Sequence, residues 1–525
     1  MSSGRKFHLF LAALAVAGSL LVWLATSSYG PGLSTDGARY LSTAESIAAG
    51  RGIIDYLGLP LVNWPPLYPI ILAGLRLLTG LDVFVLAQAV NILAFGATIY
   101  LGGLFFQRSL PGNRTFGVVA SLALATSLPL VEVSANAASD ALFLVSVLLF
   151  LLAAQDYLRE RARRSWWQMA TLAIAACFLR YAGLALVITG ALLVLWAWRK
   201  QLRRGGVEAT AFGLVAGAPI AAWALVHNLP ANGTLLGAHL PSIPLTNFLI
   251  TFEKMAGWFL PGSLLNQALG ILLFALLTLA LLAASNRQRR AAWAVRLQTA
   301  ALLPSLSFVL VYGAVLVFSI STSEHQGPGS QRIHAMLLPA FLALLGSAIT
   351  ELAPRLPKKA AGLPVRSLLL AAFALWLILP LYRLQVYVKA SMQNGDVSFY
   401  NLYNTRTLRE SDIVAHIQAR QFGEDGRVYS NNEGAAWFYL RRRIYSLPRT
   451  ETEEGEDLAD VMRSFGGWPA AGEAAMLIWF ERELDYKELV PTPEEMQAFI
   501  SLTITFAGRY GDVYLMEVGQ LKNDP

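Results

Sequence analysis

The chain has 525 residues, of which 55% are hydrophobic and only 14% charged, and its mean hydropathy is +0.49. Soluble globular domains carry about a quarter charged residues, so this composition excludes a soluble protein and predicts a polytopic membrane protein. The formal charge of +7 is divided unevenly: residues 1–389 hold 28 Lys and Arg against 12 Asp and Glu, and residues 390–525 hold 13 against 22. The basic excess lies in the apolar part, where positively charged cytoplasmic loops are its usual cause, so we expect no nucleic-acid partner.

Apolar runs long enough to cross a bilayer, about 17–25 residues, follow one another through most of the chain. They cover residues 8–26, 82–106, 115–134, 140–157, 207–227, 262–284, 298–320, 332–352 and 366–388. A further run, 166–198, is too long for one straight crossing at about 1.5 Å per residue. We expect it to form a hairpin of two short helices that turns at Arg180-Tyr181. The first run is expected to be a retained anchor, with a cleaved signal peptide as the alternative.

Basic residues flank these runs in six clusters. They lie at 5–6, 108–114, 159–164, 199–204, 287–296 and 355–366. The positive-inside rule places all six in the cytoplasm, which requires eleven crossings, provided that "LYPIILAGLRLLTG" (67–80) lies in the interface instead of crossing. We therefore predict a multi-pass protein of the cell (inner or plasma) membrane with a cytoplasmic N-terminus. Its transmembrane domain is 1–389, with interfacial helices in a first outer loop at 29–80, and its extracytoplasmic α/β domain is 390–525.

This topology gathers charged residues at the outer membrane edge. They are Asp36, Arg39, Glu45, Arg51, Asp55, Glu132, Asp140, Arg180, Glu253, Lys254, Glu324 and Arg332. Charges at that depth are costly unless they face each other or water, so each is a candidate functional residue. The alternative interpretation is that they are loop residues near lipid headgroups, or ion pairs that hold the bundle together.

Residues 36–49 are expected to form an amphipathic helix in the outer interface, capped by Ser34 or Thr35. One face of this helix carries Asp36, Arg39, Tyr40 and Thr43. Asp36 lies in the first turn, where backbone N–H groups help to keep a carboxylate ionised. Such a carboxylate, with cations nearby, is suited to removing a proton from a hydroxyl while an anionic group departs.

Later stretches add polar residues on the same side of the membrane. In chain order they are Gly50-Arg51-Gly52, Pro65-Pro66-Leu67-Tyr68-Pro69, Asp140 before Leu142-Phe143, Arg180-Tyr181-Ala182-Gly183, and Arg332 with Pro339. Together with Asp36 this order resembles the GT-C superfamily of integral-membrane glycosyltransferases, above all protein O-mannosyltransferases and the enzymes that put aminoarabinose on lipid A. The resemblance spans roughly residues 8–352. The chain departs from the pattern at Ile333-His334, where many relatives have an aromatic residue, and at Asp36-Gly37, where many have two acids.

The resemblance implies an α-helical GT-C fold and transfer of a hexose or pentose, with inversion, from a polyprenyl-phosphate donor. The acceptor would be an extracytoplasmic hydroxyl of a protein, a lipid or a cell-envelope glycan. Asp36 would be the catalytic base and Asp140 a supporting acid. The donor's phosphate and sugar would be bound by residues drawn from Arg39, Tyr68, Arg180, Arg332 and His334. No metal or other cofactor is required for this chemistry. A divalent metal is the alternative: Glu324, His325 and His334 could ligate one, although they lack metal-type spacing.

The tail, 390–525, has the pattern of a small α/β domain. "GRVYSNNEGAAWFYLRRRIYSLP" predicts strand, turn, short helix and strand, and "EAAMLIWF" predicts a buried strand. "SLTITFAGRYGDVYLMEV" predicts a hairpin that turns at Gly511-Asp512, and the acidic run "ETEEGED" (451–457) a solvated loop. The tail contains no hydrolase elbow, P-loop or nucleotide fingerprint.

Two other functions compete with a glycosyltransferase. An envelope glycan polymerase or ligase would be expected to rely on arginines in large outer loops instead of an early acid. A transporter of lipid-linked sugars would be expected to show unwound half-helices and inverted repeats at mid-membrane. The sequence has no such repeat, and its acids gather at one face.

Overall fold

The computed structural model of the chain divides into two compact units. It describes residues 3–235, 246–259, 268, 270, 272, 302–322, 331–352, 359–360, 363–397, 401–420, 426–449, 458–469, 473–481 and 490–517. The first unit, here called the helical unit, consists of Met1–Ala25, Val62–Tyr68 and Ala87–Lys389. The second, here called the mixed unit, consists of Thr26–Leu61, Pro69–Leu86 and Ala390–Pro525. The first outer loop that the sequence assigns to the transmembrane domain thus groups mostly with the tail.

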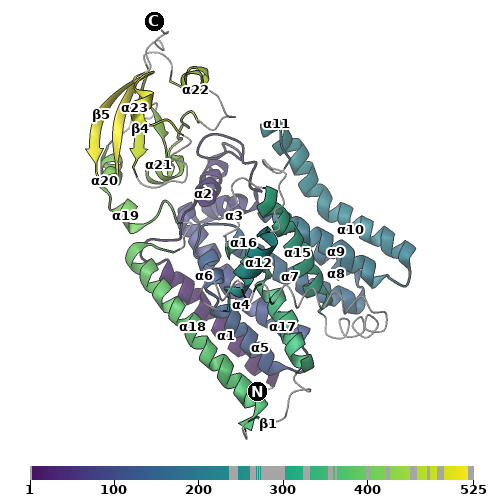
Figure 1. Cartoon of the computed structure of the whole chain (residues 1–525). Coiled ribbons are helices and arrows are strands. Elements are labelled where there is room, and N and C mark those ends of the chain that lie inside the picture. Colours follow the sequence, from purple (N-terminus) through teal and green to yellow (C-terminus); the bar gives the residue numbers. More distant parts are fainter. Residues whose placement is uncertain are drawn as a thin grey trace. The chain divides into compact units, whose positions relative to one another are not determined.

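Helices, most of them long and apolar, form most of the helical unit (Figure 1). They are α1 (Ser3–Ala25), α4 (Val83–Ser109), α5 (Arg114–Ala125), α6 (Leu128–Ser134), α7 (Asp140–Glu160), α8 (Arg163–Leu179), α9 (Leu184–Ala197), α10 (Leu202–Trp223), α11 (Leu229–Asn232), α12 (Thr246–Ala256), α15 (Leu303–Thr322), α16 (Gln331–His334), α17 (Leu338–Leu352) and α18 (Val365–Asn394). A two-residue ladder pairs β1 (Lys359–Ala360) with β2 (Leu363–Pro364). Among the described residues, seven helical segments are long and apolar enough to cross a membrane, or eight if the bent pair α5–α6 is one span. The chain is a multi-pass helical membrane protein.

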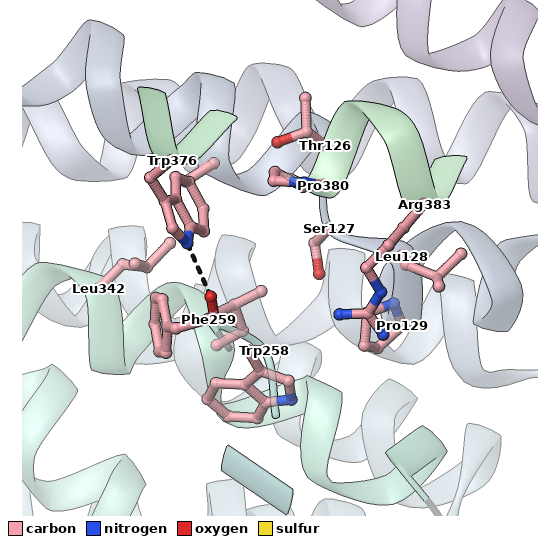
Figure 2. A pocket seen from close by; sticks show the side chains of 12 residues that line it. Thr126, Ser127, Leu128, Pro129, Trp258, Phe259, Leu342, Trp376, Pro380 and Arg383 are labelled. Atoms are coloured by element: carbon pink, nitrogen blue, oxygen red, sulfur yellow. Dashed lines mark hydrogen bonds between the residues drawn. The ribbon is translucent and has the colours of Figure 1, made fainter. Parts of the chain in front are cut away.

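Most of the predicted runs coincide with these helices, and one of them is bent. The sequence treats 115–134 as a single crossing, but α5 ends at Ala125 and α6 leaves at an angle of 53°. The reason is Pro129, labelled in Figure 2, whose ring would clash with the carbonyl of residue 125 in a continuous helix. The predicted run 262–284 lies outside the described residues, apart from three single positions.

The predicted break at Arg180 is confirmed. Helix α8 ends at Leu179, Arg180 is extended with φ −153°, and a short 3-10 turn leads into α9. Gly183 is needed in that turn because a Cβ there would lie 2.3 Å from the backbone nitrogen of Cys177. Figure 1 shows α8, α9 and α10 side by side.

The mixed unit combines first-loop helices with the tail. Its elements are α2 (Thr35–Ala48), most of α3 (Leu67–Thr79), α19 (Arg406–Arg409), α20 (Asp412–Ala419), β3 (Arg427–Ser430), α21 (Glu433–Leu440), α22 (Leu458–Ser464), β4 (Ala474–Phe480), α23 (Pro493–Met496), β5 (Ser501–Gly508) and β6 (Gly511–Glu517). The strand order is β3-β4-β6-β5; β3 and β4 are parallel and the other pairs antiparallel. One face of the sheet packs on a core that includes Tyr429, Met462 and Leu477.

Two details of the predicted tail need correction. The second strand expected after α21 amounts to a single bridge between Tyr429 and Tyr445. The hairpin turns at Arg509-Tyr510, because Gly511 already pairs with Gly508. Gly511 has φ 146°, and a Cβ there would lie 2.1 Å from the carbonyl oxygen of Trp479, so close packing explains this glycine. The acidic run 451–457 lies outside the described residues.

Candidate functional site

In the helical unit, one buried carboxylate binds two arginines. Asp140 begins α7, and its Oδ1 accepts a hydrogen bond of 2.6 Å from Arg180 while its Oδ2 accepts one of 2.7 Å from Arg332. The Asp140 side chain is 1% exposed, whereas the guanidinium side chains are 15% and 14% exposed. The structure therefore brings together three predicted site residues that lie 40 and 192 positions apart.

We call Asp140, Arg180 and Arg332 the Asp140 cluster. The local backbone positions each of its members. Arg180 occupies the extended residue between α8 and α9, and Arg332 lies on the one-turn helix α16. Two guanidinium groups share the one carboxylate of Asp140. Because charged groups are retained at such depth only where they pair or serve a function, this cluster is suited to binding an anion.

A hydrogen-bond network supports the segment that leads into Asp140. Asn91 is fully buried on α4, and its amide donates to the carbonyl of Asn136 and, at 3.3 Å, to that of Ala138. The hydroxyl of Tyr68, also fully buried, donates to Asn91 at 3.5 Å. Tyr68 thus supports the cluster indirectly, through Asn91 and the segment that precedes Asp140. Asn91 was not predicted from the sequence, although an Asn in a mostly apolar helix was the available signal.

His334 is fully buried, and its Nε2 lies 3.4 Å from the hydroxyl of Thr251. The neighbouring carbonyl of Ile333 accepts a 3.0 Å hydrogen bond from Tyr312 on α15, which fixes the short helix that carries Arg332. Glu324 and His325, considered as metal ligands beside His334, lie outside the described residues. Within the described ranges, no group of three or more His, Cys, Asp and Glu is arranged to hold a metal ion.

In the mixed unit, Asp36 lies in the first turn of α2, as predicted from the sequence. Ser34 is the N-cap, and its hydroxyl accepts a 3.3 Å hydrogen bond from the amide of Gly37. Asp36 is partly exposed. The positive end of the helix dipole therefore lies beside its carboxylate.

The predicted amphipathic character of α2 needs correction. The expected polar face is not solvated: Tyr40 is 1% exposed and Thr43 is fully buried. The reason is that residues of the first loop and the tail cover it. The amide of Tyr56 donates to Ser42 at 3.1 Å, and the ring of Tyr56 stacks on Trp437 of α21 with centroids 5.9 Å apart.

Arg39, predicted as a donor ligand, forms an ion pair with the buried carboxylate of Asp55. Its guanidinium also lies 5.4 Å from the ring centroid of Tyr56. Burial opposes the charge on Arg39, but Tyr56, Asp55 and Glu433 together raise its pKa. Asp55 in turn accepts hydrogen bonds from the amides of Leu57 and Leu59, so this ion pair orders the loop after α2.

Solved structures of other proteins resemble this arrangement of helices. ArnT from Cupriavidus metallidurans in the apo state aligns with 98% of this chain and 99% of its own, with a TM-score of 0.54 at 16% identity. ArnT from the same organism bound to undecaprenyl phosphate aligns over the full length of both chains, with a TM-score of 0.52 at 18% identity. The archaeal oligosaccharyltransferase AglB from Archaeoglobus fulgidus, in complex with an inhibitory peptide and a dolichol-phosphate, aligns with 85% of this chain and 65% of its own (TM-score 0.44, 13% identity).

The likeness to ArnT shows that this chain has the GT-C fold, as the resemblance predicted. No protein-family model matches the sequence, and no curated protein matches it.

Proposed function

We propose that this protein is an inverting glycosyltransferase that moves a sugar from a polyprenyl phosphate to an extracytoplasmic hydroxyl. The observation that carries the proposal is the Asp140 cluster, in which two partly exposed guanidinium groups are held on one buried carboxylate. Planar guanidinium groups match the oxygens of a phosphate and stay charged at any physiological pH. The fold shared with an ArnT structure that holds undecaprenyl phosphate supports this choice of donor.

In the proposed reaction, Asp36 accepts the proton of the acceptor hydroxyl. The acceptor oxygen then attacks the anomeric carbon from the face opposite the phosphate, and the bond between that carbon and the phosphate oxygen breaks. The electron pair leaves with the phosphate, whose added negative charge is stabilised by Arg180 and Arg332. A general base contributes about 10²–10⁴-fold, and fixed cations at the leaving group lower the barrier further.

We assign the remaining site residues to supporting roles. Both oxygens of Asp140 are bound by guanidinium groups, so its task is to orient the arginines. Tyr68 and His334 are fully buried and stabilise the segments that carry the cluster. Arg39, bound to Asp55, stabilises the helix that carries Asp36. We assign the N-terminus to the cytoplasm and Asp36 to the outer side, an orientation that the distribution of the basic clusters supports.

The test uses purified protein in nanodiscs with a panel of polyprenyl-phosphate hexoses and pentoses and candidate acceptors. Release of polyprenyl phosphate by the wild type is expected to fall at least about 100-fold in Asp36→Asn. The matched control is Asp156→Asn, which removes an acid from the exposed pair with Arg108 at the other end of α7. Equal release by wild type and Asp36→Asn would overturn the assignment of the base.

A further inference from the structure

Residues of the tail hold the N-terminal end of α2. The backbone oxygen of Leu33 accepts hydrogen bonds from the amides of Leu402 and Tyr403 at 3.0 and 3.2 Å, and the amide of Leu33 donates to Asn401 at 2.9 Å. The hydroxyl groups of Thr35 and Tyr403 lie 2.8 Å apart. Thr35 precedes Asp36 directly, so the tail contacts the helix one residue from the proposed base.

Tyr403 is itself held firmly. Its side chain is 4% exposed, and its carbonyl accepts a 2.9 Å hydrogen bond from the hydroxyl of Tyr439. On its other side, a Cβ at position 434 would lie 2.4 Å from its ring, so only glycine at that position lets α21 pack this closely. The Tyr403 hydroxyl is therefore held in place, and its contact with Thr35 fixes the start of α2.

The opposite end of α2 is held by the same part of the tail. Glu45, in the last turn, forms an ion pair of 3.1 Å with Arg441, and Arg441 also lies 3.6 Å from Asp82. The guanidinium stacks over the rings of Trp437 and Phe438, 5.1 Å from each centroid. Arg441 adopts φ 53°, a left-handed conformation that is strained for a residue other than glycine. The fold accepts this strain at the residue that reaches Glu45.

We propose that Tyr403 and Arg441 are positioning residues for Asp36, so that the tail completes the catalytic site. This inference rests on the proposed function of Asp36. Because the tail holds both ends of α2, the helix and its first-turn carboxylate keep one position within the mixed unit. A misplacement of about 1 Å at a reacting group can reduce a rate about 100-fold. Loss of these contacts is therefore expected to lower the rate of sugar transfer.

The experiment uses the full-length chain in nanodiscs. Tyr403→Phe removes only the hydroxyl group that contacts Thr35, and Arg441→Gln removes the ion pair with Glu45. We expect each to lower kcat about 10-fold or more with the donor KM unchanged within about twofold. The matched controls lose one phenolic hydroxyl or one guanidinium in the same unit away from α2. Tyr429→Phe loses its hydrogen bond to the carbonyl of Gly467, and Arg427→Gln loses its contact with Glu473. Both controls are expected to keep wild-type kcat.

A double-variant cycle separates positioning from loss of fold. If Tyr403 acts through Asp36, adding Tyr403→Phe to Asp36→Asn lowers the residual rate no further, although it lowers the wild-type rate. The same loss in both backgrounds would overturn the inference. Unchanged kcat in Tyr403→Phe and Arg441→Gln, with Asp36→Asn inactive, would overturn it while leaving the proposed function intact. Full activity of Asp36→Asn would instead overturn the proposed function.

A covalent bridge between positions 45 and 441 tests whether activity returns when the lost ion pair is replaced. In Glu45→Cys with Arg441→Cys, activity is expected to be low and to rise at least about threefold when a short bis-maleimide joins the two thiols. Cys177, the single native cysteine, is buried, so it does not compete for the reagent. Efficient bridging without any rise in kcat would contradict the role of Arg441.

Discussion

Two of the ionic clusters among the described residues, Asp140 with Arg180 and Arg332, and Glu45 with Arg441, differ in burial. The carboxylate of Asp140 in the helical unit is 1% exposed and binds two arginines. In the mixed unit, Glu45 is 16% exposed and Arg441 33% exposed. Ions removed from water must be compensated almost completely, whereas exposed pairs contribute about 0–1 kcal/mol each. The comparison therefore predicts that breaking the first cluster costs far more stability than breaking the second.

The largest expected effect comes from breaking the buried cluster. Asp140→Ala leaves two guanidinium groups in a low-dielectric site without their carboxylate, and removal of one partner of a buried pair costs about 3–5 kcal/mol. We expect a clear fall in the thermal midpoint in nanodiscs and loss of sugar transfer. The exposed-pair variant Asp156→Ala is the control, with an expected loss of about 1 kcal/mol or less. Equal midpoints for the two variants would contradict the difference in burial.

The second prediction concerns pH and Glu433 on α21. Burial raises the pKa of Glu433, and Arg449 and Arg39 only partly oppose this effect. The native protein therefore binds this proton more tightly than the unfolded chain. Its contribution to stability is present below the unfolded pKa of about 4.3 and is lost as pH rises through the higher native pKa.

We expect Glu433→Gln to remove part of the fall in thermal midpoint between pH 4.5 and 7.5, because glutamine does not titrate. Each unit of difference between the native and unfolded pKa corresponds to about 1.4 kcal/mol. Glu410→Gln, which changes an exposed acid, is the control and is expected to leave the pH dependence as in the wild type. A steeper pH dependence in Glu433→Gln would show that the sign is wrong.

The smallest expected effect on stability is that of Glu45→Gln. Partial exposure limits its ion pairs with Arg441 and Arg76 to about 0.5–1 kcal/mol in total, and this amount should shrink at high salt. Thermal midpoints in low and high salt measure it. A fall in thermal midpoint as large as that of Asp140→Ala would contradict the expected difference in stability between the two clusters.

The sequence predicts the helices better than it predicts the contacts between distant segments. Apolar runs and Pro, Gly and Arg positions place α1, α4, α7 and the break at Arg180, because these depend on local hydropathy and backbone geometry. The bend after Ala125 was missed because the run was interpreted by its hydropathy alone, although Pro129 gives the signal. The pairing of Asp140 with Arg332 depends on tertiary packing across 192 positions, which spacing does not contain.

The same limit applies to the first loop. Its helix and cap follow from Ser34 and Asp36, but its burial depends on Trp437 and Tyr403, far along the chain. The pattern of α2 alone therefore indicated a helix at the membrane interface. The roles of the site residues rest on the resemblance and on the chemistry proposed above.

The most direct test of the central claim is the binding of polyprenyl phosphate, without sugar or acceptor, to protein in nanodiscs. Wild type, Arg180→Gln, Arg332→Gln and the distant control Arg108→Gln are compared at two salt concentrations. A charge-assisted hydrogen bond contributes about 1.5–3 kcal/mol. The account therefore predicts that each of the two cluster variants raises the Kd at least about 10-fold, while the control binds like the wild type. Wild-type binding by both Arg180→Gln and Arg332→Gln would contradict the claim that this cluster receives the leaving phosphate.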